Sequence, residues 1–314
     1  MVHGYFNTGN SCYLNASLQC LMNIDIFVSV LKNTIINLKG YSTDNLKRYE
    51  FLNLLYDMTK ETNPVNLKQV LSEYSPLFKG NQQQDSHEAL VTIINIIHKE
   101  TKGLSSYKKR LTNETTLFEK LSNNCWEKYF TTFGYSFMDD LFSGQQVTII
   151  NCPCGENQYN FEVFNTLTVN VDPDHTNLSD SFKELFSTEV IHEYQCDKCR
   201  CKTSANKQTT VWNFPEILVV SLSRHNKAHS LKKLNCNYDI MDTISFFNER
   251  IGRVHYKLKV MTNHIGFSTN SGHYTSVVID NNNYYYIDDD KITQVAPFSK
   301  SAIVYLFVYV RDRY

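Results

Sequence analysis

A single cysteine lies where a segment rich in glycine and asparagine meets the start of a helical pattern. Residues 4–15 read Gly-Tyr-Phe-Asn-Thr-Gly-Asn-Ser-Cys-Tyr-Leu-Asn, and Leu14, Leu18 and Leu21 recur at helical spacing. We therefore expect Cys12 in the first turn of a helix, where the helix dipole and free N–H groups stabilise a thiolate. A thiolate at such a junction is a nucleophile that requires a base.

Length and charge restrict the class of protein. The chain has 314 residues, enough for a packed core without disulfides, and its net charge is -1. A net charge so close to zero argues against electrostatic binding of nucleic acid. No apolar run approaches the ~20 residues that a membrane helix needs. Residues 1–4 lack a signal-peptide pattern. We expect a monomer of the cytoplasm or nucleus, with neither nucleic acid nor membrane as a partner.

The first third of the chain has a helical apolar pattern. Asp44, Asn66 and Asp85 each precede a run of apolar residues at helical spacing and are candidate helix starts. Residues 101–135 are polar and patchy, and they predict no element.

From Phe137 onward the pattern changes to that of strands. Runs of β-branched and aromatic residues predict strands over 147–150, 161–171, 217–222, 255–262, 274–279, 283–287 and 302–310. A short helix is expected over 178–186. Helices followed by largely antiparallel strands indicate an α+β fold.

A histidine near the carboxyl end has the context of a catalytic base. His273 follows Gly272, which lets a substrate backbone approach, and it precedes the predicted strand 274–279. Asp288 ends the next predicted strand, so a tight hairpin would lay it beside His273. Taken singly, a buried cysteine is usually packing and the run 288–290 is usually a solvated turn. Their joint placement favours a papain-like order of cysteine, histidine and aspartate.

Five segments, in order, resemble the sequence boxes of the ubiquitin-specific proteases. The segment around Cys12 resembles the family's cysteine box, Gly-Leu-x-Asn-x-Gly-Asn-Thr-Cys-Tyr-x-Asn-Ser-x-Leu-Gln. The others are Gly272-His273-Tyr274 with Tyr286-Ile287-Asp288-Asp289, and the segments 78–88, 215–225 and 263–266. The departures, such as Ser11 for threonine and Ala16 for serine, remove no reacting group.

The resemblance implies roles for individual residues. Cys12 would be the nucleophile, His273 the base and Asp288 the residue that orients the imidazole. Asn7 would stabilise the oxyanion with its side-chain amide, beside the Cys12 backbone N–H, and Asp289 would share the orienting or oxyanion duty. The channel for the substrate's carboxyl-terminal tail would be lined by Gln84, Asp85, His264, Gly272 and Tyr274.

The resemblance also implies a hand-shaped, papain-like architecture and an activity. One catalytic domain over 1–314 would comprise a helical thumb (1–135), zinc-tipped β fingers (136–212) and a β palm (213–314). The implied activity is thiol-dependent hydrolysis of the isopeptide or peptide bond after the carboxyl-terminal glycine of ubiquitin, with ubiquitin and ubiquitinated proteins as partners. Two alternatives stay open, a catalytically silent ubiquitin-binding module and a protease for a ubiquitin-like modifier.

Five of the nine cysteines form tight clusters of the kind that bind metal. Cys196 and Cys199 form a Cys-x-x-Cys knuckle, while Cys152 and Cys154 form a Cys-x-Cys pair where the family usually has Cys-x-x-Cys. Two pairs of thiolates suit tetrahedral Zn²⁺, so we expect these four to bind a structural zinc with no role in hydrolysis. Cys201 is an alternative ligand, and a site that has lost zinc is the other alternative.

Overall fold

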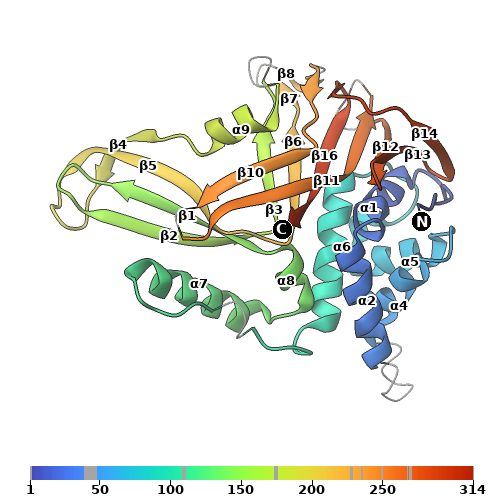
Figure 1. Ribbon diagram of the computed structural model, residues 1–314, viewed down its shortest axis with the longest axis horizontal. Helices are drawn as coiled ribbons and strands as arrows, with labels where there is room; N and C mark the ends of the chain where they lie inside the picture. Colours follow the sequence, from blue (N-terminus) through green and yellow to red (C-terminus); the bar gives the residue numbers. More distant parts are fainter. Residues whose placement is uncertain are drawn as a thin grey trace.

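The structure is a computed structural model that describes residues 2–38, 48–107, 111–172, 176–226, 229–234, 236–248, 250–266, 268 and 271–313. Helices occupy the first part of the chain and strands most of the rest, which confirms the α+β order (Figure 1). The helix start predicted at Asp44 lies outside the described residues.

The thumb is built from helices in the first hundred residues. They are α1 (Cys12–Met22), α2 (Asp25–Leu38), α4 (Glu50–Asp57), α5 (Val65–Tyr74), the 3-10 helix η1 (Pro76–Phe78) and α6 (Ser86–Thr101). Asp85 caps α6 as predicted, because its Oδ1 accepts the backbone N–H groups of His87 at 2.7 Å and Glu88 at 3.2 Å. Helix α5 begins at Val65 with Pro64 at its N-cap position, two residues before the start predicted from Asn66.

Segment 101–135, where no element was predicted, contains helix α7 (Leu117–Phe133). Thr116 and Glu119 form a capping box: the threonine Oγ1 accepts the Glu119 N–H at 3.2 Å, and the Glu119 carboxylate accepts the Thr116 N–H at 2.9 Å. The Thr-x-x-Glu spacing is a sequence signature of a helix N-terminus. The irregular apolar pattern that follows it gave no prediction of a helix. Helix α8 (Phe137–Phe142) follows after a short break.

The palm is an eight-stranded sheet. Its strands run in the order β14-β13-β12-β11-β16-β6-β3, with β10 also paired to β11. Their bounds are β3 (Thr166–Asn170), β6 (Ile217–Ser223), β10 (Thr243–Asn248), β11 (Gly252–Ile265), β12 (His273–Asp280), β13 (Asn283–Asp288), β14 (Lys291–Val295) and β16 (Val304–Asp312). All neighbours are antiparallel except β3 and β6. Two small pairs lie outside it, β7 (His225–Asn226) with β8 (His229–Lys233) and β9 (Tyr238–Asp239) with β15 (Lys300–Ser301).

The fingers are a separate four-stranded sheet in the order β2-β1-β5-β4. Its strands are β1 (Gly144–Asn151), β2 (Asn157–Phe164), β4 (Glu189–Gln195) and β5 (Lys202–Asn213). The expected finger range 136–212 therefore divides between two sheets. The predicted strand 161–171 is two strands that part at Asn165, and the second of them, β3, joins the palm beside β6. Helix α9 (Leu178–Leu185), close to the predicted 178–186, packs on that same palm core.

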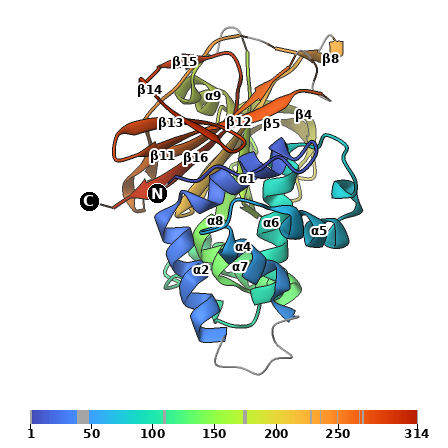
Figure 2. The ribbon, with the colours of Figure 1, turned by 90° about the vertical axis from the view of Figure 1, so that its right-hand side faces the viewer.

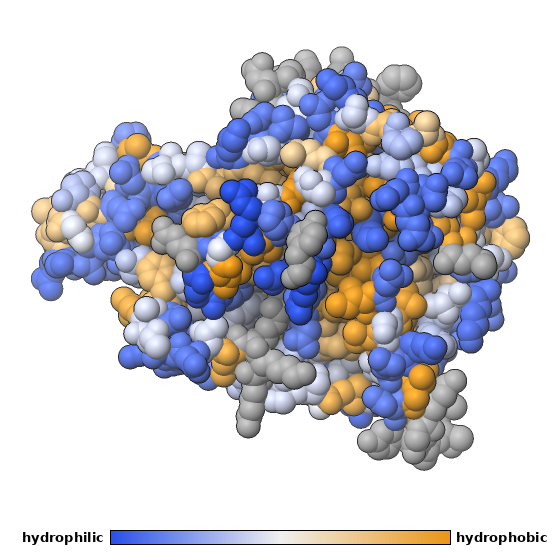
Figure 3. All heavy atoms as spheres, viewed as in Figure 1, coloured by the Kyte–Doolittle hydropathy of each residue, from blue (hydrophilic) through white to orange (hydrophobic). Residues whose placement is uncertain are grey.

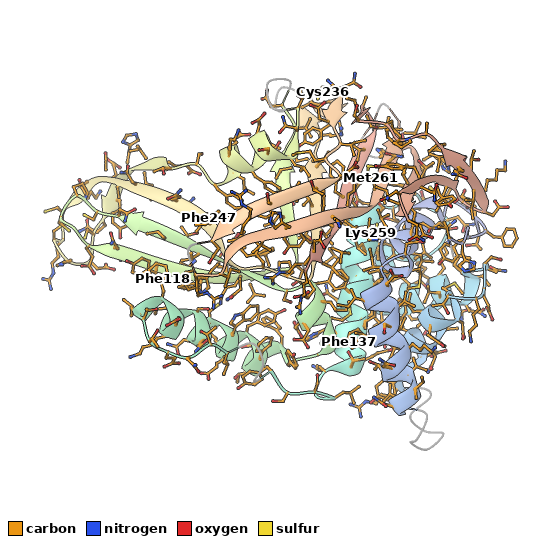
Figure 4. All side chains as sticks on the ribbon, viewed as in Figure 1. Phe118, Phe137, Cys236, Phe247, Lys259 and Met261 are labelled. Atoms are coloured by element: carbon orange, nitrogen blue, oxygen red, sulfur yellow. The ribbon has the colours of Figure 1, made fainter. Side chains whose placement is uncertain are left out.

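Aromatic side chains hold α7 against the fingers. Phe118 is labelled on α7 in Figure 4. Its ring centroid lies 4.4 Å from that of Tyr159 and 5.3 Å from that of Trp212. In Figure 3, the largest gathering of hydrophobic residues on this face lies where thumb and palm meet, and the finger end is mixed.

The two faces of the palm sheet pack on different partners. Alternate residues such as Val260 and Val308 face the thumb helices, whereas Met261 and Phe307 face the side covered by α9 and β10. Helix α1 lies between the palm strands and the other thumb helices (Figure 2), and it contacts β11, β12 and α6. This sandwich brings the start of α1 to the start of β12. No single described helix is long and apolar enough to cross a membrane; only α1 and α2, bent at 88°, pass that test as a pair.

Candidate active site

Cys12 is the first residue of α1 and is only 4% exposed. The loop before it turns sharply at Gly9 and Asn10, whose φ angles are 94° and 49°. Helix α1 packs against β12, and the backbone N–H of Tyr274 there lowers the pKa of the Cys12 thiol. The nucleophile predicted from the sequence therefore lies against the palm strand that begins with His273.

The β12–β13 hairpin joins His273 to Asp288. Antiparallel pairing around the turn at Asn281 and Asn282 sets the register, and the His273 Nε2 lies 2.6 Å from the Asp288 Oδ1. A carboxylate only accepts hydrogen bonds, so Nε2 carries the proton and Nδ1 is the nitrogen left to act as a base. This is the geometry that the hairpin argument predicted.

Asp289 ties the two halves of the site together. Its carboxylate accepts the side-chain amides of Asn7 at 2.9 Å and Asn15 at 2.7 Å, and its backbone carbonyl accepts the Tyr5 N–H at 2.9 Å. Its φ of 53° is in the left-handed region, at the turn that directly follows β13. Ligand atoms of His273, Asp288 and Asp289 all lie within 4.8 Å of one another.

Asn15 is a site residue that the sequence analysis did not single out. It is 3% exposed, and its amide donates to the Tyr5 carbonyl at 3.0 Å as well as to Asp289. The available signal was a polar residue three positions after Cys12, on a helix whose other side chains are mainly apolar. Such a residue, when buried, requires a partner.

The expectation that the helix start stabilises a Cys12 thiolate is wrong for the free protein, because burial outweighs the backbone N–H groups and favours the neutral thiol. Burial raises the pKa of Cys12, the Tyr274 N–H lowers it, and the negative charge of Asp289 raises it again. The thiol therefore needs a base to become a nucleophile, because its own ionisation is suppressed.

Replacing Asp289 with asparagine is expected to lower the pKa of Cys12. Removal of the nearby negative charge stabilises the thiolate, so alkylation of Cys12 by iodoacetamide should reach its half-maximal rate at a lower pH than in the wild type. Peptide mass spectrometry isolates the Cys12 signal. The matched control is Asp290→Asn, which should leave the profile unchanged; an upward shift for Asp289→Asn would contradict the assigned effect.

The five residues predicted to line the tail channel all line one cleft of about 570 Å³. Gly272 forms a narrow point there, because a Cβ would lie 2.5 Å from the Ile265 carbonyl oxygen and would collide with the His264 ring. The His264 and Tyr274 rings lie 4.7 Å apart. Asp85 has a structural duty in addition, since its Oδ2 accepts the Tyr305 hydroxyl at 2.6 Å while Oδ1 caps α6.

Four cysteines meet at the tips of the finger hairpins. The sulfurs of Cys152, Cys154, Cys196 and Cys199 all lie within 4.8 Å of one another, with Cys152–Cys199 at 4.0 Å and Cys154–Cys196 at 3.7 Å. Tetrahedral zinc with Zn–S of about 2.3 Å requires sulfurs about 3.8 Å apart, so this set fits the ion. Backbone N–H groups of Cys199, then Lys198, lower the pKa of Cys196, whereas burial and hydrogen bonds with the neighbouring sulfurs raise that of Cys152. Cys201 is exposed and outside this group, its sulfur donating instead to the Cys199 carbonyl.

Comparisons with known proteins agree on one family. The family model described as ubiquitin carboxyl-terminal hydrolase matches residues 3–309. Ubiquitin carboxyl-terminal hydrolase 4 of Vanderwaltozyma polyspora is 28% identical over 325 residues, covering 88% of this chain and 36% of that protein. Ubiquitin carboxyl-terminal hydrolase 21 of Rattus norvegicus is 29% identical over 313 residues, covering 87% of this chain and 55% of that protein.

A solved structure shares the fold. It is a chain of the SAGA Ubp8/Sgf11/Sus1/Sgf73 DUB module bound to ubiquitin aldehyde, with a TM-score of 0.76, 20% identity, and coverage of 99% of this chain and 70% of that chain. The protein thus spans about a third to a half of the curated relatives' length and most of the structural one. Because the family model covers nearly every residue, this chain belongs to the ubiquitin carboxyl-terminal hydrolase family.

Proposed function

We propose that the protein is a thiol-dependent deubiquitinase that hydrolyses the bond after the carboxyl-terminal glycine of ubiquitin. The observation that carries this is the 2.6 Å contact between Asp288 at the end of β13 and His273 at the start of β12, the strand against which the Cys12 helix packs. Membership of the family supports the reaction class, and the ubiquitin aldehyde bound in the solved module supports ubiquitin as the ligand. The cleft narrowed by Gly272 is lined by Tyr274, a neighbour of Cys12, and it suits a tail without bulky side chains.

The first half of the reaction transfers ubiquitin to the enzyme. Nδ1 of His273 takes the Cys12 proton, and the sulfur attacks the carbonyl carbon of the terminal glycine. The tetrahedral intermediate collapses when the imidazolium gives its proton to the leaving amine, and a thioester remains. Asp288 holds the ring and stabilises the imidazolium through the Nε2–H bond.

The second half releases ubiquitin. His273 removes a proton from water, which attacks the thioester carbonyl, and Cys12 leaves as a thiolate that takes the proton back. The Asn7 amide has two N–H donors, one of which is bonded to Asp289. The other is free of that bond and is the donor we assign to the oxyanion, together with the Cys12 backbone N–H.

The same proposal includes a structural zinc at the finger tips. Cys152, Cys154, Cys196 and Cys199 would hold it, joining the β1–β2 and β4–β5 hairpins. The ion would only cross-link the two hairpins. It would take no part in the hydrolysis, which uses Cys12 and His273. A cytoplasmic or nuclear location and a monomeric state remain predictions.

Hydrolysis of a fluorogenic reporter fused to the ubiquitin carboxyl terminus tests the proposal. We expect turnover with ubiquitin and little with reporters built on ubiquitin-like modifiers, and an electrophilic ubiquitin probe should form a covalent adduct at Cys12. Saturable ubiquitin binding without turnover or adduct would identify a silent binding module. Turnover confined to another modifier's reporter would identify a protease for that modifier.

A further inference from the structure

Lys68 is a buried cation that the reaction described above does not use. It lies on α5 at 9% exposure, and its Nζ donates to the Gly9 carbonyl at 2.9 Å and to the Asn81 Oδ1 at 3.2 Å. Both acceptors are neutral, and no carboxylate of the described residues lies within ion-pair distance of this amine. Burying an ammonium group without a counter-charge is unfavourable, and burial accordingly lowers the pKa of Lys68.

Asn81 grips the same turn from the other side. Its backbone carbonyl accepts the Asn10 side-chain amide at 2.8 Å. Its side-chain amide packs against Gly9 so closely that a Cβ on Gly9 would lie 3.1–3.3 Å from it. Lys68 and Asn81 therefore enclose the Gly9–Asn10 turn, in which both residues have positive φ angles.

This turn determines where the Asn7 amide points. The Asn7 Oδ1 accepts the backbone N–H groups of Gly9 and Ser11, each at 3.1 Å. With the oxygen side held by the turn, the Nδ2 side faces Asp289 and the site. A shift of the Gly9–Asn10 turn would therefore move an oxyanion donor without moving the Cys12–His273–Asp288 group.

We propose that Lys68 and Asn81 are positioning residues that fix the oxyanion donor Asn7 through the Gly9–Asn10 turn. This rests on the deubiquitinase function proposed above. The amine acts by holding the Gly9 carbonyl, and Asn81 links that amine to the turn. Because neither residue touches the nucleophile or base in the described structure, their loss should slow acyl transfer while ubiquitin binding and thiol reactivity persist.

The test compares four variants on the ubiquitin reporter. Lys68→Met keeps an unbranched side chain, one atom shorter, and removes the donor. We expect kcat to fall roughly 10- to 100-fold, with KM and ubiquitin affinity unchanged. Alkylation of Cys12 by iodoacetamide, which needs no oxyanion donor, should keep its wild-type rate. Lys68→Arg should restore part of kcat. Lys120→Met, which removes an exposed charge from α7, is the matched control.

Asn81→Ala gives an independent arm, because Asn81 is exposed and its loss does not empty the core. It should lower kcat in the same direction, again with unchanged KM. A wild type that fails to hydrolyse the reporter refutes the proposed function. If the wild type is active and kcat is unchanged in both Lys68→Met and Asn81→Ala, only this inference is refuted. The same conclusion follows if kcat, ubiquitin affinity, the alkylation rate and the melting temperature all fall together in Lys68→Met.

Discussion

Replacement of Cys12 by alanine is expected to lower kcat on the ubiquitin reporter by about 10⁴-fold or more. The sulfur is the atom that forms the thioester, and no other side chain of the site can replace it as a nucleophile: His273 is the base, and the two aspartates hold His273, Asn7 and Asn15. Ubiquitin affinity should be retained, because the cleft and the palm surface are unchanged. Steady-state kinetics and isothermal titration calorimetry measure the two quantities.

Cys20 provides the matched control for this substitution. It lies on the same helix, is fully buried in the core, and burial strongly raises its pKa. Cys20→Ala should cost stability, as deletion of a buried sulfur does, and should leave kcat near that of the wild type. Full turnover in Cys12→Ala, or loss of turnover in a folded Cys20→Ala, would overturn the assignment of the nucleophile.

The parts of the site that the sequence predicted are those with local signals. The place of Cys12 at a helix start was predictable because a loop rich in glycine and asparagine is followed there by a helix pattern. The position of Asp288 was predictable because a short hairpin fixes the pairing register of its two strands. In the structure the Asp288 carboxylate lies 2.6 Å from His273. Lys68 and Asn15 gave no such signal, since their roles depend on partners 59 and 274 positions away in the chain.

The fold, like the site, was predictable where the sequence carries local signals. Helix α6 has both an apolar stripe and the Asp85 cap, so its start was predicted correctly. Strand β3 was merged with β2 because only the break at Asn165 separates them, and β3 pairs with β6 some fifty residues later. Sequence pattern shows that a segment is a strand, but it does not show which sheet the strand joins.

Substitution of Cys196 by serine is expected to release zinc and to loosen the fingers without unfolding the palm or thumb. Strand β4 has no buried side chain and β2 has only half-buried and exposed ones, so apolar packing near the tips is weak. A structural zinc contributes about 10 kcal/mol or more in small zinc domains, far above what such packing supplies. We therefore expect the hairpin tips to separate once one of the four sulfurs is removed.

The expected readouts of Cys196→Ser separate the fingers from the catalytic site. Metal content measured by native mass spectrometry should fall to zero. Amides of the end of β4 and the start of β5 should exchange faster with deuterium, and ubiquitin affinity should drop by at least about tenfold. Alkylation of Cys12 should not change, because the palm and thumb cores exclude the finger tips. Cys201→Ser is the control, since the Cys201 sulfur lies outside the cluster of four. If Cys196→Ser retains zinc and Cys201→Ser loses it, the ligands are a different four of the five cysteines. If the wild type contains no zinc, packing alone holds the two finger hairpins together.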